Sequence, residues 1–191
     1  MGLGNNEGGQ STWLKIANGK LYLTSDKTKE NPFSYVSGIV TGMYFKEEKW
    51  EDTEYEVLNV QIRSGESKYI LTIRVESGYF ATFVNFFASV DPKKEVKINP
   101  MEATNDQGKK KYTLFVSQDG VTKAKYTRDS PDGPPSFEKV TLGKKVMYDT
   151  SKFTEFWKNK ISKFEFSQSE QKPRPEPQPT LANNADDDLP F

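Results

Sequence analysis

Two alternating stretches decide the fold, YEVLNVQIRS at residues 55–64 and KYILTIRVE at residues 68–76. In each, apolar side chains such as Leu58 and Leu71 alternate with polar ones, which is the pattern of a strand with one buried face. Gly65 separates the stretches, so we predict two paired strands with one apolar and one polar, basic face. The predicted outward side chains are Asn59, Gln61, Arg63, Lys68, Thr72 and Arg74.

The residues before this pair predict a bent strand and a hairpin. Residues 34–45 are rich in β-branched and aromatic side chains, and Gly38 and Gly42 suit a strand that bends or bulges. Residues 13–24 contain an Asn-Gly pair, the favoured two-residue turn, between two short alternating runs. An N-terminal hairpin is therefore expected.

The residues after the pair predict two helices and more strands. Residues 78–90 change to helical spacing, and we interpret their rings as the plug of a barrel. A second, amphipathic helix is expected at about residues 151–163, after a Pro/Gly loop at residues 129–136. Strand patterns return between the helices, at residues 95–101, 110–118 and 121–128.

Three strands, a helix and then at least two strands follow the element order of the OB-fold, a five-stranded Greek-key barrel that commonly binds oligonucleotides. The expected fold is all-β dominated: an OB-fold with an N-terminal hairpin, one helix between strands 3 and 4, and a C-terminal helix. A β-sandwich with an inserted helix would give much the same order. The length of 191 residues suits one domain at residues 12–166, between disordered ends at residues 1–11 and 167–191.

The composition excludes several classes of enzyme. The chain has no Cys and no His, which excludes disulfides, thiolate or imidazole zinc sites, and Ser-His or Cys-His catalytic pairs. Glu95-Val96-Lys97 has the acid-x-Lys spacing of some metal nucleases. No well-placed upstream Pro-Asp pair accompanies it, and this alternation is typical of an edge strand. We therefore expect a protein that is not an enzyme, with no catalytic residues, no metal and no cofactor.

The charges are balanced in number but not in position. The chain has 27 Lys+Arg and 27 Asp+Glu, yet residues 171–191 hold two basic and four acidic side chains. An acidic tail thus follows a mildly basic body. Residues 1–10 lack the apolar run of a secretion signal, and no stretch approaches the roughly 18 apolar residues of a membrane span. These features predict a cytoplasmic protein without membrane contact, and they leave its oligomeric state open.

The chain ends in an acidic triplet followed by an apolar residue, a proline and a phenylalanine: Asp186, Asp187, Asp188, Leu189, Pro190 and Phe191. This ending resembles the C-terminal tip of bacterial single-stranded DNA-binding proteins, and the Pro- and Asn-rich segment before it resembles that family's disordered linker. The family's usual strand sequences are absent from the body, so the chain looks like a divergent bacteriophage version. Its location would then be the host cell cytoplasm.

The resemblance implies a protein that coats single-stranded DNA and recruits replication, recombination or repair proteins through its tip. A terminal Phe offers a ring and a free carboxylate on one residue, which an apolar pocket with a basic lip can bind. Two alternatives stay open. The protein would be an adaptor or inhibitor that occupies the receptors of the host single-stranded DNA-binding protein without binding DNA, or the acidic end would have arisen by chance.

A protein that holds single strands without sequence preference needs cations for phosphates and rings for stacked bases. The polar face of the central pair supplies the predicted cations. The predicted stacking rings lie in polar or loop contexts: Tyr44, Trp50, Tyr55 and Tyr126. A basic hairpin that carries Lys110, Lys111, Lys123 and Lys125 is expected to clamp the strand against the main sheet. The alternative for each of these groups is an ordinary solvated face or loop.

Overall fold

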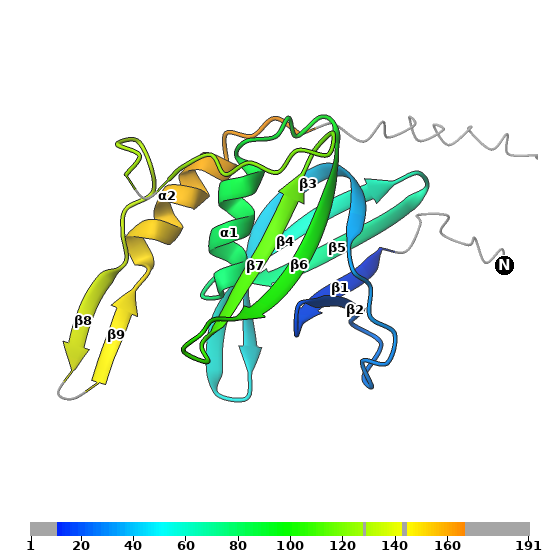
Figure 1. Ribbon diagram of the computed structural model, residues 1–191. Coiled ribbons are helices and arrows are strands. Elements are labelled where there is room, and N and C mark those ends of the chain that lie inside the picture. The colour runs from blue at the N-terminus through cyan, green and yellow to red at the C-terminus, as the bar shows by residue number, and fades with distance from the viewer. Residues whose placement is uncertain (1–10, 128, 143–144, 167–191) are drawn as a thin grey trace, which may run out of the picture.

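A curled seven-stranded sheet forms most of the molecule, as a half-barrel with two helices (Figure 1). The computed structural model describes residues 11–127, 129–142 and 145–166. The strands of the large sheet are β1 (Thr12–Ala17), β2 (Lys20–Leu23), β3 (Val36–Trp50), β4 (Thr53–Ser64), β5 (Ser67–Arg74), β6 (Glu95–Thr104) and β7 (Lys110–Ser117). The other elements are α1 (Gly78–Phe87), the strands β8 (Glu138–Leu142) and β9 (Lys145–Asp149), and α2 (Ser151–Ile161). The order in the large sheet is β2-β1-β5-β4-β3-β6-β7.

The central antiparallel pair β4 and β5 buries the predicted inner face, while residues 57–60 and 70–71 are buried on both faces. Val60 lies opposite Leu71, and both are fully buried on the inner face. β3 pairs with β4 on the other side, and its register shifts between Val40 and Gly42, which confirms the predicted bulge. At Gly38 a Cβ atom would lie 2.3 Å from the carbonyl oxygen of Arg63, so any other residue would push β3 away from β4.

The N-terminal hairpin is confirmed, and it forms part of the main sheet. Asn18 and Gly19 make the turn with φ angles of 50° and 67°. β1 then pairs in parallel with β5, which places Leu14 beside Leu71 in the core. The backbone N–H of Gly19 donates a hydrogen bond of 3.0 Å to the hydroxyl of Tyr79, at the start of α1. The hairpin is therefore held at its strand and at its turn.

Helix α1 fills the half-barrel, as its helical spacing predicts. Phe80, Phe83 and Phe87 are almost completely buried in the main core. The helix also lies along β7, the last strand of the sheet, where the backbone N–H of Leu114 donates to the Thr82 hydroxyl at 2.9 Å. A helix side chain thus satisfies part of an edge that would otherwise need a neighbouring strand.

The segment after β7 differs from the expectation. Residues 121–128 were expected to form a strand, but among the described residues only Val121 makes a bridge, to Gln118. The reason is Asn85 of α1, whose side chain accepts from the backbone N–H of Tyr126 and donates to its carbonyl oxygen, at 2.9 and 3.0 Å. These bonds replace a strand partner. The β8–β9 hairpin follows and was not anticipated, and α2 buries Trp157 in the core.

Within the described residues, neither helix is long and apolar enough to cross a membrane.

Candidate nucleic-acid interface

Four neighbouring strands, β1, β5, β4 and β3, present one continuous outer face. The register sets its side chains in rows across the strands. The middle row runs from Lys15 through Thr72 and Asn59 to Tyr44. A second row holds Arg74, Val57 and Lys46, and a third holds Trp13, Ile70 and Gln61. The predicted polar face of the central pair is therefore wider than expected, because β1 extends it by one strand.

A groove of about 820 Å³ lies on this face, toward the turn between β3 and β4. We call it the outer groove. Its lining combines rings with cations: Trp13, Trp50, Tyr55, Lys15, Lys27 and Arg74. Trp50 is 69% exposed and Trp13 39% exposed, although rings of this size are usually well buried. Two indoles open to solvent in one groove are suited to stacking on flat ligands.

The guanidinium of Arg74 is held over the ring of Tyr55. Its Cζ atom lies 4.7 Å from the ring centroid, and its Nη2 lies 3.1 Å from a carboxylate oxygen of Glu76. The Tyr55 hydroxyl in turn lies 3.5 Å from Glu48, a long hydrogen bond. One face of the Tyr55 ring, which was predicted to stack on a base, is thus already covered by the Arg74 guanidinium. The ring positions Arg74, whose side chain is half exposed, so the N–H groups that Glu76 does not use can bind phosphate.

The same face continues into a smaller hollow of about 220 Å³. Three predicted residues line it, Gln61, Arg63 and Lys68. Between the hollow and the outer groove lies Tyr44, another predicted ring, which is partly exposed. The central pair therefore brings together most of the side chains that the sequence analysis selected on β3, β4 and β5.

Asn59 is a predicted contact residue that is buried on this face, like Val57 and Ile70. It is fully buried, and its side-chain oxygen accepts a hydrogen bond of 2.9 Å from Thr72. Its amide nitrogen has no partner among the described residues. Alternation placed Asn59 on the outward face, but the side chain is buried there. We therefore remove Asn59 from the set of residues that contact a ligand directly.

The predicted basic hairpin is wrong, because its two halves lie at opposite ends of β7. Lys110 and Lys111 begin the strand, where Lys110 pairs with Glu102, a contact that raises the pKa of the lysine. This end adjoins Tyr79, which lines the outer groove. Lys123, Lys125 and Tyr126 lie beyond the other end, over α1. They contribute nothing to the outer groove.

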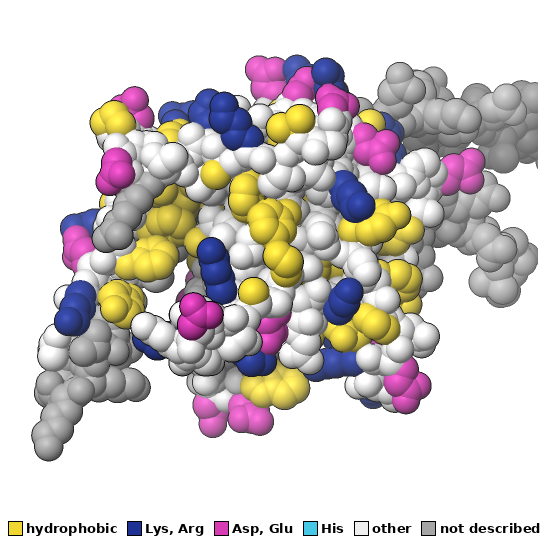
Figure 2. All heavy atoms as spheres, in the orientation of Figure 1, with side chains coloured by type: hydrophobic (Ala, Val, Ile, Leu, Met, Phe, Trp, Pro, Cys, Tyr) yellow, Lys and Arg dark blue, Asp and Glu magenta, His cyan; other side chains and the backbone are white. Residues whose placement is uncertain are grey.

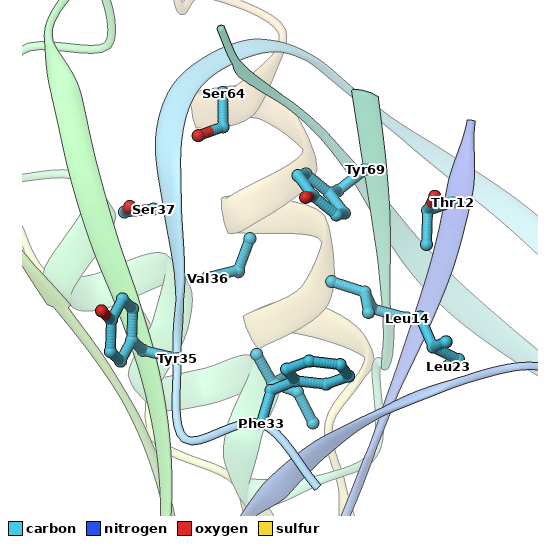
Figure 3. Close-up of a pocket in the computed structure, with 10 residues that line it drawn as sticks. Thr12, Leu14, Leu23, Phe33, Tyr35, Val36, Ser37, Ser64 and Tyr69 are labelled. Atoms are coloured by element: carbon cyan, nitrogen blue, oxygen red, sulfur yellow. The ribbon is translucent and has the colours of Figure 1, made fainter. Parts of the chain in front are cut away.

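A second hollow, of about 380 Å³, opens where the N-terminal hairpin meets β3 and β5 (Figure 3). Figure 3 shows Phe33, Leu14, Val36 and Tyr69 directed toward it. Its lining, as far as the described residues show, is apolar apart from hydroxyl groups and includes no charged side chain. It therefore lacks the cations that a phosphate backbone requires, and the outer groove is the better candidate for a nucleic acid.

Sequence reasoning missed Trp13, Lys15 and Lys27 as lining residues. The alternation of β1 does place Trp13 and Lys15 opposite to the buried Leu14. Nothing in the local sequence shows that β1 lies beside β5, so this signal was not sufficient. The tip, residues 186–191, lies outside the described residues. Scans of protein-family models, curated proteins and solved structures found no match for this chain.

Proposed function

We propose that this protein is a non-enzymatic single-stranded DNA-binding protein. It coats and protects single strands during replication, recombination or repair, and it recruits partner proteins through residues 186–191. One observation supports the binding activity most strongly: two exposed indoles, Trp13 and Trp50, share the outer groove with the guanidinium of Arg74. Rings that stack on any base and cations that meet any phosphate bind single strands without reading their sequence.

The strand arrangement supports an OB-fold assignment. Counted from β3, five strands with α1 after the third have the OB-fold's element order. OB-folds bind oligonucleotides on the face of strands 2 and 3 and on the loops between strands 1 and 2 and between strands 4 and 5. In this chain those parts are β4 and β5, the turn beside Trp50, and the turn before Lys110. β4, β5 and the turn beside Trp50 line the outer groove, and the turn before Lys110 lies near Tyr79 of its lining.

One feature distinguishes this chain from a closed five-stranded barrel. Closure would require β5 to pair with β7. Among the described residues β5 pairs instead with β1, and α1 lies against β7. We propose that the N-terminal hairpin takes the place of the closing strand and widens the binding face. The fold is then a partly open barrel, adapted by this hairpin.

The test is a fluorescence titration of the full chain with oligo-dT at several salt concentrations. Trp13 and Trp50 are exposed and Trp157 is buried, so binding in the outer groove should quench most of the solvent-accessible indole emission. The affinity should fall steeply as salt rises, because bound phosphates release their counterions. Absence of quenching and of binding at low salt would refute the proposal. It would favour the adaptor that carries a tip without binding DNA.

A further inference from the structure

A second basic surface lies away from the outer groove, where residues 121–127 cross α2. Residues 121–127 contain Lys123 and Lys125, and residues 158–163 contain three lysines; neither segment has an acidic residue. The two segments touch at Lys160, whose Nζ lies 5.9 Å from the ring centroid of Tyr126 and 5.6 Å from that of Phe156. We call Lys123, Lys125, Lys160 and Lys163, with these two rings, the α2 patch.

The backbone of the α2 patch is fixed in place by Asn85. The Asn85 side chain makes two hydrogen bonds with the backbone of Tyr126. The backbone carbonyl oxygen of Asn85 accepts a third, from the backbone N–H of Lys125 at 3.0 Å. Tyr126 also packs edge-on against Trp157 of α2, with ring centroids 5.9 Å apart. The exposed lysines of residues 121–127 therefore stand on a defined surface, although the segment has no regular secondary structure.

Among the described residues, the lysines of the α2 patch have no acidic partner, a property that they share with Lys15 and Lys27 of the outer groove. In the part of the chain that the structure describes, none of the four forms an ion pair, whereas neighbouring Lys158 pairs with Glu56. Arg74 of the outer groove pairs with Glu76, and Lys46, elsewhere on the same face, pairs with Glu48. Clustered lysines without ion pairs repel one another, so a bound polyanion would relieve a cost that the free protein carries.

Strand β7 connects the two surfaces. It begins at Lys110, beside Tyr79 of the outer groove, and leads at its other end into residues 121–127. Eight residues of strand span about 27 Å, a distance that about eight nucleotides cover at duplex spacing. Figure 2 shows Lys and Arg side chains spread over the side of the molecule that Figure 1 presents.

We infer that the α2 patch is a second binding site for the phosphates of the same single strand, reached along β7 after the strand leaves the outer groove. This inference rests on the proposed function. Lysines are mobile point charges, which suits phosphate contacts without base recognition. Two separated contacts on one strand make the second binding event intramolecular, so long oligonucleotides bind more tightly than short ones.

The test compares dT6, which the outer groove alone can hold, with dT30, which can reach both surfaces. Lys125→Gln with Lys160→Gln should leave dT6 binding unchanged. The same variant should lower the salt slope for dT30 by about 1.4, at about 0.7 per lost phosphate contact on a single strand. The matched control is Lys29→Gln with Lys139→Gln, which removes two exposed lysines away from the α2 patch.

The outcomes separate the two proposals. An unchanged dT30 slope, or an equal decrease in the control variant, would overturn the α2 patch as a DNA contact while the outer groove still bound dT6. Binding of an acidic peptide should also be measured. If the α2-patch variant lost peptide binding but kept dT30 binding, the inference would be overturned and the patch would be a protein-binding site. If the parent protein bound neither oligonucleotide, the proposed function itself would fail.

Discussion

At the scale of single residues, Trp50 is the side chain on which DNA binding should depend most. It is 69% exposed at the edge of the outer groove and makes no core contact. Trp50→Ala should weaken oligo-dT binding by about 1–3 kcal/mol, or roughly 5- to 150-fold, because one stacking surface is lost. Fluorescence anisotropy of a labelled dT oligomer measures this change. Tyr148→Ala is the control, since Tyr148 is a ring of similar exposure (63%) on β9; an equal loss in that variant would contradict the assignment.

Arg63 and Arg74 should contribute through charge. They lie on the same face, at the smaller hollow and at the outer groove respectively. The double variant Arg63→Gln/Arg74→Gln should lower both the affinity for oligo-dT and the salt slope, the slope by about 1.4 if each residue binds one phosphate. Titrations between 50 and 200 mM salt measure the slope. A weaker affinity with an unchanged slope would show that the guanidinium groups do not contact phosphates.

Tyr79 should couple the stability of the protein to alkaline pH. The side chain is 8% exposed, and burial raises the pKa of its phenol above the usual 10.0. Because the folded state favours the neutral phenol, its contribution to stability is complete below pH 10 and is lost as pH rises through the raised pKa. Tyr79→Phe also leaves the N–H of Gly19 without its acceptor, at a cost of about 1–3 kcal/mol near neutral pH.

The measurement is urea unfolding of the parent and of Tyr79→Phe at pH 8 and pH 10.5. The gap in free energy of unfolding between them should narrow at the higher pH, since only the parent loses the contribution of Tyr79. A constant gap would show that Tyr79 titrates equally in the folded and unfolded states.

At the scale of elements, Asn85 should hold residues 121–127 on α1. Asn85→Ala removes the partners of the Tyr126 N–H and carbonyl groups and should destabilise the protein by about 1–3 kcal/mol. Chemical unfolding measures the loss, and hydrogen exchange should show faster exchange at Tyr126. Asn159→Ala, an exposed change on α2, is the control. Equal stability of the two variants would mean that the segment docks by its rings alone.

At the scale of the whole molecule, the tip and the body should act separately. Deletion of residues 186–191 should leave oligo-dT binding equal or tighter, because an acidic segment that competes for the basic surface is removed. Capture of replication or repair proteins from a host extract should be lost together with the tip. Anisotropy and pull-down measure the two effects. Weaker DNA binding by the shortened chain would contradict this division of roles.

Local patterns in the sequence determined the elements of this protein. The alternation around Leu58 and Leu71 predicted the central strands, the Asn18-Gly19 turn predicted the hairpin, and the ring spacing of residues 78–90 predicted α1. These signals are local, because the side-chain periods of strands and helices depend on near neighbours only. The polar face of β4 and β5 followed from the same alternation.

Only the tertiary structure decided which elements are neighbours. The place of the N-terminal hairpin depends on the bond between Gly19 and Tyr79, which are 60 residues apart, and on parallel pairing with β5. The separation of Lys123 and Lys125 from Lys110 depends on Asn85 and Tyr126, which are 41 residues apart. Alternation shows which side of a strand is polar, but it carries no information on what lies beside that strand. For this reason the sequence alone predicted the outward face of β4 and β5, and the structure was needed to add Trp13 and Lys15 and to remove Asn59.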